Sequence, residues 1–196
     1  MSTIPGRVVP VTETRWLAEP QQRSWRAYVR MQGRLAAALN RQLQTDSELS
    51  LADFDVLVAL TDVADGRVRV FELGLLLQWE KSRLSHHLSR MARRGLIARQ
   101  ECCDDGRGAF AVLTDAGRRA IEAAAPSHVD AVKRLVFDGL TPDQVAALGE
   151  VCEHVLSRLA AQDPCRSAAG CGDIPDGVPA EALTAGQGAS GSPPVR

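Results

Sequence analysis

Basic side chains gather in one segment of the chain, between Lys81 and Arg99. The segment holds six lysines and arginines and no aspartate or glutamate. Leu84, Leu88 and Met91 recur at helical spacing, so an α-helix over residues 81–94 would turn these three side chains inward and present the polar ones outward. The major groove of duplex DNA admits one α-helix, and arginine bonds guanine there through two parallel hydrogen bonds. The segment therefore predicts a helix that reads DNA.

The outward positions of this predicted helix supply the candidate DNA contacts. Arg83 and His86 are long enough to reach base edges, whereas short serine side chains near the helix start let the backbone approach the groove. The free amides of a helix N-terminus also bind phosphate. The candidates on this helix are Ser82, Arg83, Ser85, His86 and Arg90. The alternative is an ordinary solvated helix face, since basic helices are common.

A predicted β-hairpin follows the basic helix directly. Residues 96–101 and 110–113 have the pattern of two strands, and the sequence Asp-Asp-Gly-Arg-Gly over residues 104–108 is a strong turn signal. Arg107 stands at the tip of this hairpin, where it would reach a minor groove next to the helix. A short helix at 71–77, the basic helix and an arginine-tipped hairpin, in this order, predict a winged helix-turn-helix. The combination disfavours the solvated-face alternative.

Amphipathic helices flank this predicted lobe on both sides. Apolar residues at spacings of three and four predict a long helix that includes residues 25–43, and Ser50 with Asp53 predicts the capped start of a second helix. Residues 67–70 alternate like one short strand. Thr114 opens a helix that is expected to reach about Phe137 with a kink at Pro126, and Thr141 caps a last helix whose apolar face includes Cys152. The expected fold class is mainly α.

Three segments resemble the MarR family of winged helix-turn-helix regulators. Residues 105–117, DGRGAFAVLTDAG, resemble the family's wing signature, residues 82–99 its recognition helix and following strand, and residues 50–60 the helix before the helix-turn-helix. The resemblance implies that Asp105 orders the wing by pairing with arginines and that Arg107 enters the minor groove. It also implies DNA contacts at the five helix positions given above.

The resemblance further implies a homodimer formed by the terminal helices, residues 16–45 and 114–161, around a DNA-binding lobe at 50–113. Two-fold symmetry would place two recognition helices one DNA turn apart, so the expected partner is double-stranded DNA with a pseudo-palindromic operator. Residues 1–15 are expected to form a flexible arm and the Gly- and Pro-rich residues 163–196 a disordered tail. Three positions depart from the family pattern, namely Gly74, Gln78 and Glu80.

The signal that such a repressor would sense has three candidates. The resemblance implies a small aromatic or phenolic effector, which Trp16, Trp25 and Tyr28 could bind, although the latter two could equally form dimer-interface packing. A redox switch at Cys102 and Cys103 is the second candidate. The alternative is that both thiols are inert, because the adjacent acidic residues oppose a lowered thiol pKa. A zinc site between His128 and His154 is the third, the simpler reading being two unliganded histidines.

Composition restricts the remaining function classes. The chain has 196 residues, 45% of them hydrophobic and 24% charged, and a net charge of -1, which disfavours indiscriminate nucleic-acid binding. No apolar run is long enough to span a bilayer and no secretory signal is visible, so the expected location is the cytoplasm, associated with the nucleoid. The sequence shows no motif of an enzyme, of a cofactor site or of a metal site. A helical scaffold that binds only protein is the remaining alternative.

Overall fold

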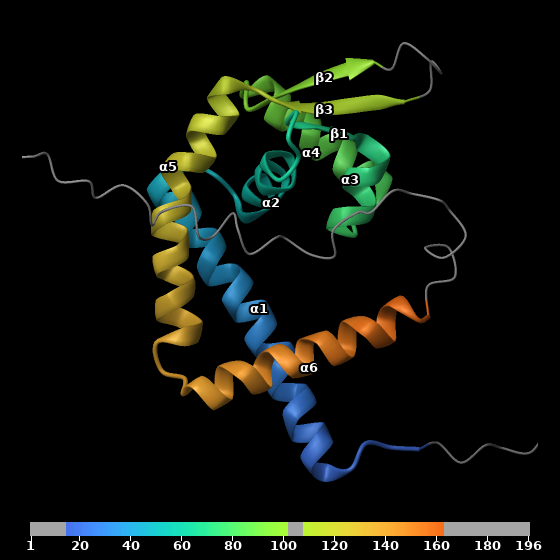
Figure 1. The fold of residues 1–196 in the computed structure, drawn as a ribbon, viewed down its shortest axis with the longest axis vertical. Coiled ribbons are helices and arrows are strands. Elements are labelled where there is room, and N and C mark those ends of the chain that lie inside the picture. Colours follow the sequence, from blue (N-terminus) through green and yellow to red (C-terminus); the bar gives the residue numbers. More distant parts are fainter. Residues whose placement is uncertain (1–14, 102–107, 163–196) are drawn as a thin grey trace, which may run out of the picture. The chain divides into compact units, whose positions relative to one another are not determined.

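The computed structural model describes residues 15–101 and 108–162 (Figure 1). The chain forms two compact units, up to Leu35 and from Ala36 onward, and the division falls within the first helix. The elements in chain order are α1 Glu19–Ser47, α2 Leu51–Thr61, β1 Arg67–Arg69, α3 Val70–Leu77, α4 Lys81–Arg93, β2 Ile97–Glu101, β3 Ala109–Leu113, α5 Asp115–Val132, η1 Lys133–Phe137 and α6 Pro142–Ala160. The expected mainly helical fold with a small wing is confirmed.

Two predicted helix starts are confirmed by their capping geometry. The hydroxyl of Ser50 accepts the amide of Asp53 at 3.0 Å, and the Asp53 carboxylate accepts the amide of Ser50 at 2.9 Å. Thr141 and Gln144 form the same reciprocal pair at the start of α6. Each box satisfies amides that the first helical turn leaves without partners, so these helices begin where the sequence predicts.

The wing is a three-stranded antiparallel sheet rather than a lone hairpin. β2 pairs with β3 from Ile97 opposite Leu113 to Glu101 opposite Ala109, and β1 pairs with the other edge of β3, where Val68 faces Ala111. The strand order is β1-β3-β2. The sequence predicted β1 as a strand but not its partner. Because β1 leads directly into α3, this pairing ties the helix-turn-helix to the base of the wing (Figure 1).

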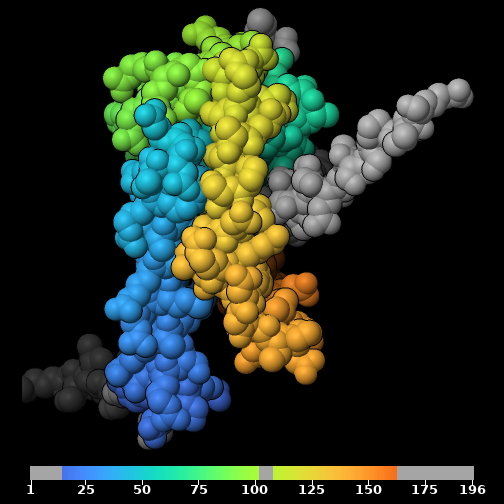
Figure 2. All heavy atoms as spheres, turned by 90° about the vertical axis from the view of Figure 1, so that its left-hand side faces the viewer, coloured from blue at the N-terminus to red at the C-terminus, as the bar shows by residue number. Residues whose placement is uncertain are grey.

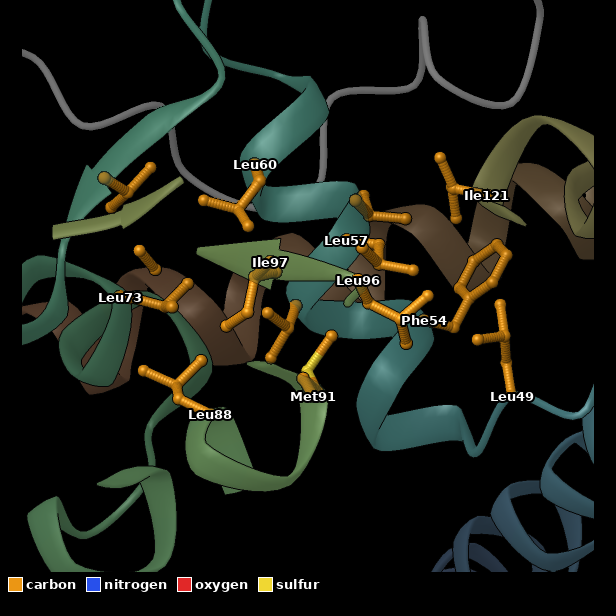
Figure 3. Close-up of a cluster of buried hydrophobic side chains, with 14 of the residues drawn as sticks. Leu49, Phe54, Leu57, Leu60, Leu73, Leu88, Met91, Leu96, Ile97 and Ile121 are labelled. Atoms are coloured by element: carbon orange, nitrogen blue, oxygen red, sulfur yellow. The ribbon is translucent and has the colours of Figure 1, made fainter. Parts of the chain in front are cut away.

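One hydrophobic core joins α2, α3, α4 and the sheet. Leu57, Leu60, Leu73, Leu88 and Met91 are completely buried in it. Figure 3 shows side chains from these helices meeting those of β2 and α5, including Ile97 and Ile121. The predicted inward stripe of α4, Leu84, Leu88 and Met91, is confirmed, and it fixes which face of α4 remains outside.

Thr114 and Gly117 fasten the start of α5 to the start of β2. The Thr114 hydroxyl lies 2.7 Å from the carbonyl oxygen of Gly95 and 2.9 Å from that of Leu96, and it accepts the Gly117 amide at 3.0 Å. Gly117 is buried, and a Cβ at this position would lie 2.0 Å from the Leu96 carbonyl oxygen. The close approach of two backbones therefore requires a glycine here.

Helix α5 also packs against the C-terminal part of α1, residues 36–47, as the space-filling view shows (Figure 2). Gln42 bridges the two helices, because its side chain contacts the Ser127 hydroxyl at 3.1 Å and Nδ1 of His128 at 3.3 Å. His128 is buried against the ring of Phe54, and this burial lowers its pKa. The helix continues past Pro126 to Val132 and becomes π-helical over Lys133–Phe137.

Helix α6 keeps its apolar stripe exposed in the single chain. Val151, Leu156 and Leu159 are each more than half exposed, and Cys152, which the sequence placed on a buried stripe, is exposed as well. Residues 19–35 of α1 are likewise exposed except for the partly covered Leu35. Within residues 15–101 and 108–162, both stripes therefore remain largely uncovered, although a regular amphipathic pattern predicts a cover.

Two consecutive helices end in the same motif with different residues. At the end of α4, Gly95 has φ of 73°, and the amides of Gly95 and Leu96 bond the carbonyls of Ala92 and Met91. At the end of α3, Gln78 has φ of 53°, and the amides of Gln78 and Trp79 bond those of Leu75 and Gly74. This is the Schellman motif, whose left-handed residue favours glycine.

We expect Gln78→Gly to raise the free energy of unfolding by about 1 kcal/mol, because a non-glycine residue is strained in the left-handed region. Gly95→Ala should lower it by a similar amount, since no atom lies within 4 Å of the added Cβ and only the backbone angle penalises it. Urea denaturation at one protein concentration measures both changes. A loss of stability in Gln78→Gly would show that the side-chain bond of Gln78 to the Leu75 carbonyl outweighs the strain.

Candidate nucleic-acid interface

Helix α4 presents the predicted contact residues on its outer face. Ser82, Arg83, His86 and Arg90 are exposed and Ser85 is half-buried, whereas Leu84, His87, Leu88 and Met91 are buried beneath them. The helix has no acidic residue, and its start lacks a side-chain cap because Glu80 makes no such bond. Its first amides therefore remain open to an anion such as a phosphate. The structure brings all five predicted α4 residues onto one helix, as expected.

Trp79 orients one of the exposed arginines. The guanidinium carbon of Arg83 lies 4.4 Å from the centroid of the Trp79 ring, within the range of a cation–π contact. Trp79 sits in the turn between α3 and α4 and is itself half-buried. The sequence suggested a base-reading role for Arg83 but gave no sign of this support. The signal would have been an aromatic residue one turn before an arginine on a recognition helix.

Arg94 does not belong to the basic face, although the sequence grouped it there. Its NH1 lies 2.8 Å from Oδ2 of Asp53, and its NH2 donates to the Glu48 carbonyl oxygen at 2.7 Å. The other carboxylate oxygen of Asp53 lies 3.1 Å from Nε2 of His87, and both side chains are 6% exposed. This contact falls short of hydrogen-bond geometry, and among the described residues the nitrogen has no hydrogen-bond partner. Asp53 therefore joins the cap of α2 to the middle and the C-terminal end of the recognition helix.

The pKa values of two carboxyl groups on α2 are shifted in opposite directions. Burial alone would raise the pKa of Asp53, but the close contact with His87 and the hydrogen bonds from Ser50 and Arg94 together hold it well below the ordinary value of 3.8. Burial raises the pKa of Asp55 to about 6, and the nearby basic side chains of His87 and Arg83 only partly oppose this. The two residues lie two positions apart on one helix, so their environments and not their type decide the protonation.

Two arginines of β1 lie over an aromatic ring of β3 in the wing sheet. The guanidinium carbons of Arg67 and Arg69 lie 3.8 and 5.1 Å from the centroid of the Phe110 ring. Arg67 is exposed on β1, and Phe110 on β3 lies opposite Arg69 in the strand register. The sequence did not single out these arginines, because their position beside β3 depends on a pairing between distant segments.

Several predicted residues lie elsewhere or outside the described parts. Asp105, Arg107, Cys102 and Cys103 fall outside the described residues. Trp16, Trp25 and Tyr28 belong to the first compact unit and are exposed, and the rings of the last two stack at 5.7 Å.

The two histidines of the predicted zinc site lie in different surroundings. His128 is buried against Phe54 and Gln42, whereas His154 is exposed on α6. Within residues 15–101 and 108–162, no three potential metal ligands lie together. None of the helices described here combines the length and hydrophobicity of a membrane span.

A helix seated on a core by one face, basic on the other and followed by a β-wing, defines the winged helix-turn-helix class of DNA-binding proteins. The structure is similar to Sco3205 of Streptomyces coelicolor, a MarR family transcriptional regulator solved in complex with DNA, with 40% identity and a TM-score of 0.71 over 75% of this chain and 92% of that one. The chain belongs to the MarR family of transcriptional regulators. It is a DNA-binding transcription regulator and not an enzyme, as the sequence predicted.

Two further structures of the same family support this assignment. AbsC, a MarR family regulator of Streptomyces coelicolor, is 34% identical with a TM-score of 0.70 over 76% of this chain and 99% of that one. A mutant of E. coli MarR in complex with operator DNA is 26% identical with a TM-score of 0.61 over 67% of this chain and 92% of that one. Comparisons with family models and with curated proteins gave no match.

Proposed function

We propose that the protein is a homodimeric repressor that reads a pseudo-palindromic operator through α4 and releases it when a small aromatic or phenolic molecule binds. The observation that carries this proposal is the outer face of α4. Arg83, His86 and Arg90 are exposed there without a neighbouring acid on the helix, while the inner face anchors the helix in the core. No acidic residue of α4 balances the charge of this face, and the face matches the donors and charges that DNA recognition needs.

The dimer rests on the uncovered apolar stripes. The stripe of α6 includes Val151, Leu156 and Leu159, and residues 25–31 of α1 expose Trp25, Val29 and Met31. Contiguous apolar surface of this kind is typical of obligate interfaces. We place the dimer interface at residues 16–45 and 114–161, around a DNA-binding lobe at 50–113. A two-fold dimer then repeats the α4 face once per half-site.

The proposed effector rests on the aromatic side chains of the first unit. Trp16, Trp25 and Tyr28 offer two indoles and a phenol, and the stacked pair of Trp25 and Tyr28 is a surface on which a planar ring could lie. Arg30 adds a cation two residues further on, which suits an aromatic acid. In the absence of such a molecule, the same aromatic rings would pack in the dimer interface.

Selection of bound fragments from a pool of random duplexes tests DNA recognition. We expect one pseudo-palindromic family of sequences, bound with an affinity that falls steeply as salt rises. Arg83→Ala should weaken binding to the selected duplex by about 1–3 kcal/mol and relax the preference at one base pair in each half-site. Arg134→Ala, which removes an equal charge from an exposed site on η1, is the control and should change little. Equal binding of the wild type to every duplex would refute sequence-specific recognition.

Sedimentation equilibrium tests the dimer. We expect a dimer for the full chain and a monomer for the double variant Val151→Glu/Leu156→Glu, because two buried carboxylates per chain would have to be desolvated at the interface. Both side chains are more than 60% exposed in the single chain, so the fold of the protomer should survive. Arg158→Glu changes charge on the same helix outside the apolar stripe and should leave the dimer intact. A monomeric wild type would contradict the proposed dimer.

A further inference from the structure

We propose that His87 is a positioning residue that holds Arg90 ready for DNA. The proposal rests on the proposed DNA-reading role of α4. Arg90 lies on the exposed face of this helix, and its NH2 group lies 2.9 Å from Nδ1 of His87, one turn earlier on the buried side. The ring of His87 therefore contacts a candidate DNA contact from inside the protein, although it cannot touch DNA itself.

The hydrogen bond from Arg90 fixes the state of the ring. A guanidinium has only donors, so Nδ1 of His87 must accept, and a neutral imidazole then carries its proton on Nε2. That nitrogen faces Oδ1 of Asp53 at 3.1 Å. A doubly protonated ring would have no acceptor for Arg90. The neutral Nε2–H form is thus the form that can serve both neighbours at once.

The ring is held from its other sides as well. The indole of Trp79 meets it edge to face, with centroids 5.2 Å apart, and His87 as a whole is 5% exposed. Asp53 is fixed in turn by Arg94 and by the amide of Ser50. Asp55 and Arg83 are the other charges that face this cluster. The contacts run from the capped start of α2 through a rigid ring to the outer face of α4.

This arrangement gives Arg90 an advantage in binding. A free arginine loses much rotamer freedom when it is fixed against a phosphate or a base, which weakens binding. An arginine already bonded to a buried ring loses less. The cluster should therefore increase the affinity for DNA without adding a contact to it.

Two conservative variants separate positioning from support of the fold. His87→Asn places an amide oxygen near the position of Nδ1, so it keeps an acceptor for Arg90 and loses the contact with Asp53. His87→Gln places an amide NH near the position of Nε2, so it keeps a donor to Asp53 and loses the acceptor. We expect the glutamine variant to be the more stable of the two and to bind the selected duplex about 3- to 10-fold more weakly than the asparagine variant.

A purely structural histidine would give the opposite order of DNA affinities. The glutamine variant would then be close to wild type, and the asparagine variant would be weakened in both stability and DNA binding. That result would overturn the proposal. Coupling to Arg90 is the second measurement. Arg90→Ala and His87→Gln/Arg90→Ala should bind equally weakly, because the effect of the ring passes through Arg90. Additive losses would also overturn it.

The free protein provides a readout that needs no DNA. Nitrogen-15 spectra of the histidine rings distinguish the Nε2–H form from the Nδ1–H form and from the imidazolium, and we expect the first for His87 at neutral pH. Either other form overturns the positioning role even where DNA recognition is intact. A wild type with the expected ring state but no sequence preference would instead refute the proposed function and, with it, the purpose assigned to the ring.

Discussion

Gly117→Ala should lower the free energy of unfolding by about 3 kcal/mol, because the added methyl group has no room. Its Cβ would lie 2.0 Å from the Leu96 carbonyl oxygen and 3.0 Å from Cδ1 of Leu113. The oxygen belongs to backbone at the start of β2, so it cannot swing away like a flexible side chain. Relief of the clash would separate α5 from β2 and break the bonds of Thr114 to the Gly95 and Leu96 carbonyls.

Urea denaturation at a fixed protein concentration measures this loss, since the midpoint of a dimer depends on concentration. Gly149→Ala is the matched control. Gly149 lies inside α6 with no atom within 4 Å of an added Cβ, so the alanine should be neutral or stabilising by up to about 1 kcal/mol. Equal stability of Gly117→Ala and wild type would show that α5 and β2 can move apart freely. In that event the glycine of the wing signature would need a different explanation.

Features that depend on neighbouring residues were predictable from the sequence. The Ser50 cap and the Thr141 box each involve groups within three positions of one another, and both are confirmed. The outer face of α4 follows in the same way from the helical repeat. Local chemistry thus sufficed to place the elements in order and to find the candidate contact residues.

Features that depend on distant residues were not predictable. The bond between Asp53 and Arg94 joins residues 41 positions apart, and no spacing rule selects that partner. For this reason Arg94 was grouped with the basic face although it neutralises a buried carboxylate. His87 was not singled out, because its orientation toward Asp53 and Arg90 depends on how α4 packs. The pairing of β1 with β3 was missed for the same reason.

The apolar stripes of the terminal helices are mostly not packed against another part of the described chain. The periodic apolar stripes of α1 and α6 predict burial, and in the single chain most of both stripes is exposed. Cys152 shares this outcome. The pattern indicates that something covers these helices, and a second copy of the chain is the cover that we propose.

Asp53→Asn should destabilise the protein by about 3 kcal/mol at neutral pH, whereas Asp55→Asn should stabilise it by about 1 kcal/mol. Asp53 is ionised and held by His87, Ser50 and Arg94, so an amide leaves Arg94 without its counterion, removes the carboxylate beside His87 and weakens the cap of α2. Asp55 makes no ion pair among the described interactions, so its charge is buried with little return. The gain is kept small because the group is partly open to solvent.

The pH dependence gives each prediction a separate sign. The stabilisation from ionised Asp53 is complete above its unfolded pKa of 3.8 and is lost as the pH falls toward the depressed pKa of the folded state, so the deficit of Asp53→Asn should shrink in acid. The destabilisation from Asp55 is absent below 3.8, grows between 3.8 and about 6, and is constant above, so the advantage of Asp55→Asn should appear over that interval. Urea midpoints at about pH 4, 5 and 7.5, which lie at the lower end of that window, inside it and above it, measure both. An advantage of Asp55→Asn that does not change with pH would show that the raised pKa is not its cause. A neutral Asp53→Asn would mean that Arg94 and His87 find other partners, and that the cluster beneath the recognition helix is looser than its distances indicate.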